Sequence, residues 1–175
     1  MFEIRIHSRG GQGGVTAARL VALAAFRDHK YATACPFYGA ERRGAPVVSF
    51  VRIDDSPIKV YSQIRKPDMV VVLDNSVMDV VDVLQGLRQG GSVLLNGSGK
   101  VDIKGFKTYS VDLTSIALRV GLVVAGSPIL NTPVIGALAK MNIISMESAK
   151  SAISEMFTDA RNIQAAEEAY REMVL

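Results

Sequence analysis

The sequence has very few residues of the kinds that form disulfides or bind metals. It contains one cysteine, Cys35, and two histidines, His7 and His29, among 175 residues. One thiol cannot form an internal disulfide, and one thiolate cannot hold an iron–sulfur cluster, which needs about four. The two histidines are isolated and have no partner at metal-ligand spacing. We therefore expect no cofactor or metal to be bound by this chain alone.

The sequence also lacks long apolar runs and an excess of one charge. Basic residues number 20 and acidic residues 17, giving a formal net charge of +3, and the signs alternate along most of the chain. A nucleic-acid-binding protein concentrates Lys and Arg on one face. No stretch approaches the roughly 20 apolar residues that span a bilayer, and Glu3, Arg5 and His7 interrupt the start where a signal peptide would be apolar. We expect a cytoplasmic protein with no nucleic-acid or membrane partner.

The composition that remains is that of a folded globular domain. Hydrophobic residues make up 49% of the chain and charged residues 21%, which excludes intrinsic disorder. Tryptophan is absent and aromatic residues amount to 6%, so aliphatic side chains must fill most of the core. A chain of this length buries enough surface to fold without disulfide bonds or a bound metal. We predict a single domain over residues 1–175.

The first part of the chain has the pattern of a strand, a turn and a helix. Apolar and polar residues alternate over 2–7, which predicts a strand with one face in the core. A glycine-rich turn at 10–14 follows, and then 15–26 is rich in alanine and leucine, which favours a helix packed closely on a sheet. The next predicted strand covers 31–35 and ends at Pro36. Together these elements begin a βαβ unit.

The rest of the chain alternates between β-branched runs and helical spacing. Residues 47–53 and 58–64, separated by the turn composition of 54–57, predict an antiparallel hairpin and hence a mixed sheet in an α/β fold. Residues 69–73 form an unbroken apolar run typical of a central strand, followed by Asn75 or Ser76 as a helix cap. Thr132 before Pro133 is a capping pair. The remaining predicted elements are a helix at 77–87, strands at 92–95 and 107–111, and helices at 113–120, 132–141, 145–157 and 162–174.

The glycine turn leaves two interpretations open. Glycines there allow positive φ, and the following helix N-terminus offers free N–H groups, so a phosphate or carboxylate is a natural ligand. The dinucleotide-binding fingerprint is incomplete, because Thr16 stands where the third glycine belongs and no acidic residue ends the second strand. A P-loop needs the tripeptide Gly-Lys-Ser/Thr, and none follows the turn. The turn either contacts an anion or cofactor, or serves only the packing of helix on sheet.

A second unusual segment occupies residues 37–46. It places Glu41, Arg42 and Arg43 between two glycines, immediately before a strand. Arginine binds carboxylates and phosphates with two hydrogen bonds, and arginine and tyrosine are enriched at interface centres. The alternative is an exposed polar loop with an internal ion pair worth well under about 1 kcal/mol. If the strands before this loop and before the glycine turn are parallel neighbours, the two segments share a site.

Other residues point to structural roles. His7 is expected to be a hydrogen-bonded structural residue, and Cys35 a small buried one. Asp74 either faces a ligand or caps a helix. Ser8 has no recognisable base or orienting acid, so a nucleophilic triad is not supported. These patterns predict a binding or assembly role.

Three segments in order resemble one family, the gamma subunits of 2-oxoacid:ferredoxin oxidoreductases. They are Gly-Gly-Gln-Gly at 10–13, Tyr-Gly-Ala-Glu-Arg-Arg-Gly-Ala-Pro-Val at 38–47, and Pro-Ile-Leu-Asn-Thr-Pro at 128–133 with Gly-Ala-Leu at 136–138. Within the family the middle segment is most similar to the pyruvate branch, pyruvate synthase. Ala45 stands where the 2-oxoglutarate branch usually has a second glycine, and Ser8 replaces the first glycine of the family's turn.

The resemblance implies a three-layer α/β/α domain with a mixed, mostly parallel sheet. It implies a complex that converts a 2-oxoacid and coenzyme A to acyl-CoA and CO2 and reduces ferredoxin, using thiamine diphosphate, Mg2+ and [4Fe–4S] clusters bound by other subunits. The implied partners are alpha, beta and delta subunits, with ferredoxin reached through the complex. The chain alone is then inactive; a stand-alone nucleotide-binding protein, a pure scaffold or a 2-oxoglutarate member of the family are the alternatives. The implied cofactor contacts are Gly10, Gly11, Gln12, Gly13, Arg42 and Arg43, and the implied interface residues are Tyr38, Gly39, Glu41, Gly44 and Asn131.

Overall fold

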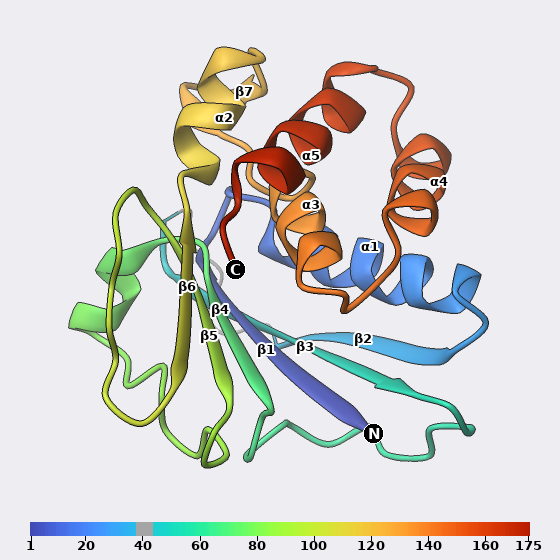
Figure 1. Cartoon of the computed structure of the whole chain (residues 1–175), viewed down its shortest axis with the longest axis vertical. Coiled ribbons are helices and arrows are strands. Elements are labelled where there is room, and N and C mark those ends of the chain that lie inside the picture. The colour runs from blue at the N-terminus through green and yellow to red at the C-terminus, as the bar shows by residue number, and fades with distance from the viewer. Residues whose placement is uncertain (38–43) are drawn as a thin grey trace.

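A mixed six-stranded sheet forms the centre of the protein. The computed structural model describes residues 1–37 and 44–175. The strands lie in the order β2-β3-β1-β4-β5-β6 (Figure 1). β3 is antiparallel to both of its neighbours, whereas β1, β4, β5 and β6 are parallel. This arrangement confirms the predicted α/β class and the mixed, mostly parallel sheet. The strands are β1 (Phe2–Arg9), β2 (Tyr31–Phe37), β3 (Pro46–Asp54), β4 (Met69–Val72), β5 (Ser92–Asn96) and β6 (Lys107–Val111).

Helices cover one face of this sheet and supply the main core. Ile4 and Ile6 belong to this core with the small side chains of α1, which confirms the predicted strand. The prediction that only one of its faces is buried is wrong, because its polar residues are buried as well. Figure 1 shows α1, α3 and α4 over the sheet, with α2 and a short hairpin of β7 (Val123–Val124) and β8 (Ser127–Pro128) at its end. None of the described helices is long and apolar enough to cross a membrane. The helices are α1 (Gly14–Arg27), α2 (Leu113–Arg119), α3 (Pro133–Lys140), α4 (Met146–Met156) and α5 (Arg161–Glu172).

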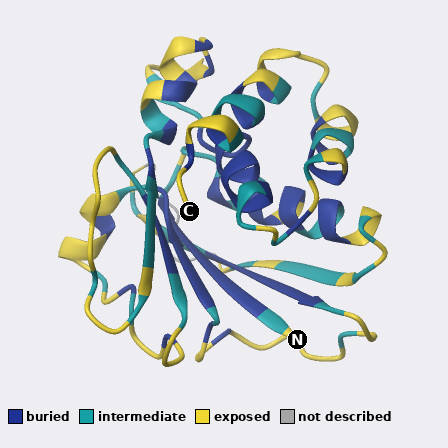
Figure 2. Ribbon diagram, viewed as in Figure 1, coloured by how far each residue is buried: buried dark blue, intermediate teal, exposed yellow. Residues whose placement is uncertain are grey.

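The opposite face is covered by irregular segments and a 3-10 helix, η1 (Asn75–Asp79). In the described part of the chain no α-helix packs on this face, so the third layer of the expected α/β/α arrangement is built differently. A smaller apolar cluster there joins Val70 and Val72 of β4 to Val77 and Val83. Because both faces are covered, the central strands are buried throughout (Figure 2).

The predicted hairpin of residues 47–53 and 58–64 is wrong. Residues 58–64 form no strand, because β3 already pairs with β1 on one side and β2 on the other. The side chain of Arg52 instead donates hydrogen bonds to the carbonyl oxygens of Val60 (3.4 Å) and Ser62 (2.7 Å). A side chain therefore satisfies carbonyl groups that a strand partner would have taken.

The predicted helix over residues 77–87 is also wrong. The helical segment stops at Asp79, and irregular turns follow. Arg5 reaches this segment from β1 and donates to the carbonyl oxygens of Val83 (2.7 Å) and Gln85 (2.8 Å). In the predicted α-helix the carbonyl oxygen of Val83 would have accepted the backbone N–H of Leu87. Asp74, and neither Asn75 nor Ser76, caps η1 by accepting from a backbone N–H.

Three smaller expectations also change. β2 continues through Pro36 to Phe37, which an edge strand tolerates because its outer side needs no donor. Cys35 lies on this edge strand and is exposed, not buried. Thr132 makes no capping hydrogen bond; its hydroxyl instead donates to Oδ1 of Asn162 at 3.3 Å.

His7 is a structural residue, as predicted. It is 5% exposed, and its Nε2 accepts a hydrogen bond of 3.1 Å from Nε of Arg5. An arginine always donates, so this nitrogen must be unprotonated. Burial, followed by the nearby charge of Arg5, lowers the pKa of His7 from 6.5 to about 4.

This buried imidazole predicts a loss of stability in mild acid. Between pH 6.5 and about 4 the unfolded chain binds a proton at His7 that the folded chain does not. The free energy of unfolding therefore falls as the pH drops through this window, by up to about 3 kcal/mol, and this contribution levels off below it. Urea denaturation at stepped pH measures the effect.

His7→Gln keeps a neutral side chain that can accept from Arg5 and should flatten the curve in that window. His29→Asn is the matched control, because His29 has a positive φ of 60° that asparagine tolerates. The control should retain the full acid loss. Equal slopes for wild type and His7→Gln would contradict the assignment.

Candidate functional site

The glycine turn joins β1 to α1 in a conformation that requires glycine. Gly11 and Gly13 have positive φ angles of 98° and 88°, and Gly13 is the residue that caps α1. A Cβ on Gly14 would lie 2.2 Å from Oγ of Ser8, closer than any side chain allows. The turn therefore brings the first N–H groups of α1 close to the end of β1 without side-chain bulk between them.

The side chain of Gln12 holds the turn in place. Its Oε1 accepts from the backbone N–H of Arg9 at 2.8 Å, and its Nε2 donates to Oδ2 of Asp74 at 2.7 Å. Burial works to raise the pKa of Asp74, but hydrogen bonds from Ser76 and Gln12 and the charge of Arg9 outweigh it and lower that pKa. The ionised carboxylate of Asp74 thus holds the turn in place. We conclude that Asp74 has a structural role and does not contact a ligand.

Gly44 and Ala45, near the C-terminal end of the 37–46 segment, lie directly against the glycine turn. Gly10 donates its N–H to the carbonyl oxygen of Ala45 at 2.9 Å, and Gly44 donates to that of Gly10 at 3.1 Å. The guanidinium of Arg9 donates to Gly44 (2.9 Å) and to Ser76. The strands before the two segments point the same way but are not neighbours, because β3 lies between them. Tyr38, Gly39, Glu41, Arg42 and Arg43 lie outside the described residues.

Asn131, at the start of α3, approaches the same turn from a distant part of the sequence. Leu130 donates its N–H to the carbonyl oxygen of Gln12 at 3.0 Å, and a Cβ on Gly13 would lie 2.9 Å from Cβ of Asn131. Asn131 is only 5% exposed, yet its Oδ1 has no hydrogen-bond partner among the described residues. Buried polar atoms are nearly always paired, so an unpaired one needs an explanation.

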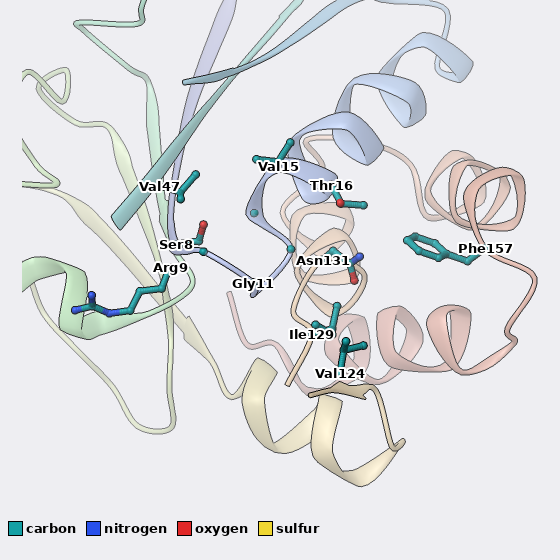
Figure 3. Close-up of a pocket in the computed structure, with 13 residues that line it drawn as sticks. Ser8, Arg9, Gly11, Val15, Thr16, Val47, Val124, Ile129, Asn131 and Phe157 are labelled. Atoms are coloured by element: carbon teal, nitrogen blue, oxygen red, sulfur yellow. The ribbon is translucent and has the colours of Figure 1, made fainter. Parts of the chain in front are cut away.

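These segments enclose a pocket with a volume of about 770 Å³. Figure 3 shows its two sides: Ser8, Gly11 and Val47 on one, and Asn131, Val124 and Phe157 on the other. The side chain of Arg9 extends away from the pocket toward η1. Of the predicted cofactor contacts in the turn, Gly10, Gly11 and Gly13 line the wall of the pocket and Gln12 does not. The lining residues are Ser8, Arg9, Gly10, Gly11, Gly13, Gly14, Val15, Thr16, Val47, Val124, Ile129, Asn131 and Phe157.

The chemistry of the pocket is that of binding. Backbone N–H groups at the N-terminus of α1 and the amide of Asn131 form a polar end suited to an anion or an amide. The far wall of Val124, Ile129 and Phe157 is apolar, and sequence reasoning missed it because these are ordinary apolar residues far from the turn. Arg9 alone among the described lining residues has an ionisable side chain. The described part of the chain contains no group of three or more His, Cys, Asp or Glu residues that could hold a metal.

Comparison with known proteins gives consistent matches over the whole chain. The family model for pyruvate ferredoxin/flavodoxin oxidoreductase matches residues 3–172. The chain is 48% identical over 186 residues to the pyruvate/ketoisovalerate oxidoreductases common subunit gamma of Thermococcus kodakarensis, covering 100% of this chain and 98% of that protein. It is 49% identical to pyruvate synthase subunit PorC of Methanocaldococcus jannaschii, covering 99% and 98%. The crystal structure of pyruvate oxidoreductase subunit PORC from Thermotoga maritima is similar with a TM-score of 0.83 and 34% identity, covering 99% and 97%.

Proposed function

The chain belongs to the pyruvate ferredoxin/flavodoxin oxidoreductase family as a gamma subunit, and on that premise we propose that it contributes a binding surface and no catalytic group. It packs on the thiamine diphosphate-binding subunits, and its pocket forms part of the site for coenzyme A. The complex converts pyruvate, coenzyme A and oxidised ferredoxin to acetyl-CoA, CO2 and reduced ferredoxin. The isolated chain is expected to be inactive.

The unpaired Oδ1 of Asn131 carries this proposal. It is a buried acceptor at the wall of a pocket, beside a glycine turn that exposes helix N–H groups. Coenzyme A has phosphates, amide groups and an apolar arm in one molecule. The N–H groups of the turn suit a phosphate, Asn131 suits an amide N–H, and the apolar wall suits the uncharged parts. These residues fit the ligand without supplying an acid, a base or a nucleophile.

The remaining parts of the complex are assigned to other chains. Alpha, beta and delta subunits hold thiamine diphosphate, Mg2+ and the [4Fe–4S] clusters, and electrons leave through them to ferredoxin. Arg42 and Arg43 stay predicted contacts for a phosphate or a partner carboxylate. One similar relative is named as the common gamma subunit of two oxidoreductases, which supports placing the choice between pyruvate and another 2-oxoacid in the partner subunits.

Replacing Asn131 by leucine tests the coenzyme A role. The change removes the amide and keeps the branched shape of the side chain. In the assembled complex we expect the KM for coenzyme A to rise about tenfold, the effect of losing one hydrogen bond in a buried site. The thermal midpoint of the free chain should change little, because Oδ1 has no partner in the described chain to lose. Steady-state kinetics and thermal unfolding measure the two effects.

Gln89→Met is the matched control, since Gln89 is an exposed amide just before β5, at the sheet edge opposite the pocket. It should leave both measurements unchanged. An unchanged KM in Asn131→Leu, together with weakened assembly, would support a pure scaffold instead. Micromolar binding of NAD by the isolated chain in calorimetry would support a stand-alone nucleotide-binding protein.

A further inference from the structure

The segment that replaces the expected hairpin strand forms an exposed basic surface, here called the basic strap (residues 59–66). It lies on the sheet face opposite the helices, and Ile64 is its one buried residue. Val60 is 44% exposed and Tyr61 74% exposed. The strap contains three basic residues and no acidic one. Lys59, Arg65 and Lys66 are exposed, and none of them forms an ion pair with a described residue.

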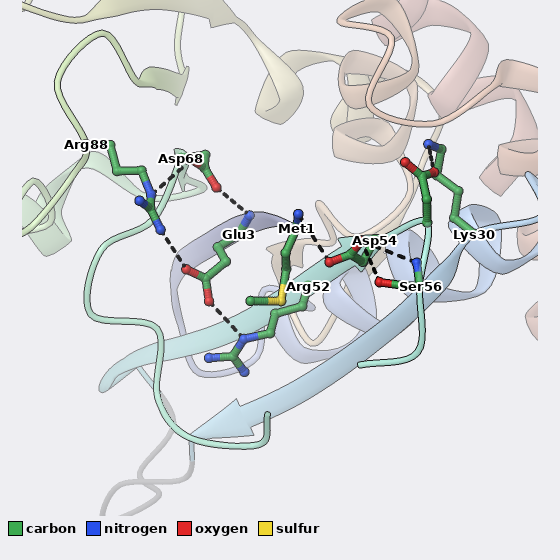
Figure 4. Close-up of polar contacts among 9 residues, drawn as sticks. Met1, Glu3, Lys30, Arg52, Asp54, Ser56, Asp68 and Arg88 are labelled. Atoms are coloured by element: carbon green, nitrogen blue, oxygen red, sulfur yellow. Dashed lines mark hydrogen bonds and ion pairs between the residues drawn. The ribbon is translucent and has the colours of Figure 1, made fainter. Parts of the chain in front are cut away.

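A charge network of buried Glu3 and Arg52 with half-exposed Arg88 holds the backbone of the strap. Figure 4 shows the carboxylate of Glu3 between two guanidinium groups, those of Arg52 (2.9 Å) and Arg88 (3.4 Å). Arg52 also binds the carbonyl oxygens of Val60 and Ser62, and Arg88 binds that of Lys66 at 2.9 Å. Three carbonyl groups of an irregular segment are therefore fixed by side chains that share one carboxylate.

This arrangement orders an exposed segment in advance of any contact. The Arg52 side chain is 3% exposed and that of Glu3 is 11% exposed, and removing such charges from water is costly. The strap buries almost nothing itself, so its fixed backbone contributes little to the core. A preordered surface loses less conformational entropy when a partner binds.

The neighbouring edge strand, β2, carries no charged side chain. The register of β2 with β3 pairs Thr33 with Arg52, so Tyr31, Cys35 and Phe37 share the sheet face of Arg52. Tyr31 is 48% and Phe37 46% exposed, and the seven residues of β2 include no charge. An uncharged edge strand next to a basic strap suits a protein partner better than a nucleic acid, which would need basic charge across the whole face.

We propose that the basic strap docks on an acidic surface of a partner subunit, with Tyr61 inserted in an apolar hollow of that surface. The proposal rests on the proposed function, because it requires a multi-subunit complex. Tyrosine is a frequent energetic centre of interfaces. The three basic side chains of the strap speed association with an acidic face through electrostatic attraction, which salt weakens.

Charge reversal tests the strap in the reconstituted complex. The triple variant K59E/R65E/K66E should lower the association rate with the co-expressed partner subunits at least about tenfold at low salt, with a smaller effect at high salt. Tyr61→Ala should instead raise the dissociation rate. Biolayer interferometry with immobilised partner subunits measures both rates, and thermal unfolding checks that the variants fold.

The matched control is K100E/K104E/K107E, which makes the same change of charge at three exposed lysines around β6. It should bind like wild type. If the wild-type chain fails to assemble at all, the proposed function fails. If wild type and the strap variant assemble at equal rates, the strap inference alone is overturned. Loss of oligonucleotide binding in the strap variant with unchanged assembly would likewise overturn it.

Discussion

Gly136→Ala is expected to destabilise the chain by at least about 3 kcal/mol, although alanine normally stabilises a helix by about 1 kcal/mol relative to glycine. Gly136 lies in α3, where α5 passes so closely that an added Cβ would meet backbone atoms of Ala166. The carbonyl oxygen would be 1.8 Å away and the carbonyl carbon 2.6 Å. Backbone atoms cannot rotate aside as a side chain can, so the two helices must separate. Urea denaturation measures the loss.

Gly105→Ala is the control for this prediction. Gly105 has a positive φ of 92°, and an added Cβ there meets nothing within 4 Å. It should cost about 1–2 kcal/mol from backbone strain alone. If Gly105→Ala lowered the free energy of unfolding more than Gly136→Ala did, the close contact between α3 and α5 would be contradicted.

Arg52→Met is expected to cost about 3 kcal/mol or more. The change leaves Glu3 buried with only Arg88 as a cationic partner, and it frees the carbonyl oxygens of Val60 and Ser62. Removing one member of a buried ion pair typically costs about 3–5 kcal/mol, and the half-exposed Arg88, 3.4 Å from Glu3, compensates the remaining carboxylate only in part. Denaturation measures the stability, and limited trypsin digestion after Lys59 and Arg65 measures release of the strap.

The double variant Glu3→Gln with Arg52→Met separates charge burial from backbone support. Removing both charges should recover much of the stability, because no uncompensated carboxylate remains. The strap should stay sensitive to trypsin, since its carbonyl groups still lack Arg52. If the single and double variants were equally unstable, the buried charge would not be the cause of the loss.

Sequence patterns predicted most elements on the helical side of the sheet. Residues 15–26 and 145–157 are helices because their spacing and composition favour helix locally, and 69–73 is a buried strand for the same kind of reason. The two mistakes, 58–64 and 77–87, lie on the other face. In both, arginine side chains on β1 or β3 bind carbonyl groups that regular structure would have used. No local pattern in those segments indicates that their carbonyl groups will accept hydrogen bonds from a side chain distant in sequence.

The candidate site, too, could be predicted from the sequence only in part. The glycine turn and the following segment were recognisable because their composition is unusual over a few consecutive residues. The contact of Gly10 with Gly44 and Ala45 has another cause than the predicted one: β1 pairs with β3, and Arg9 lies opposite Pro46. The closeness of Asn131 to Gly13, its unpaired oxygen and the apolar wall with Phe157 required the folded chain.

The sequence by itself determined the α/β class, the positions of α1 to α5 and the family of the chain, because these depend on periodicity and on short runs of consecutive residues. Tertiary structure alone decided which polar groups are paired. Arg5 donates to carbonyl groups that lie 78 and 80 residues later in the sequence, and Arg52 donates to Glu3, 49 residues earlier. Hydrogen bonds act over about 3 Å, so partners this distant in sequence are chosen only when the whole sheet has assembled.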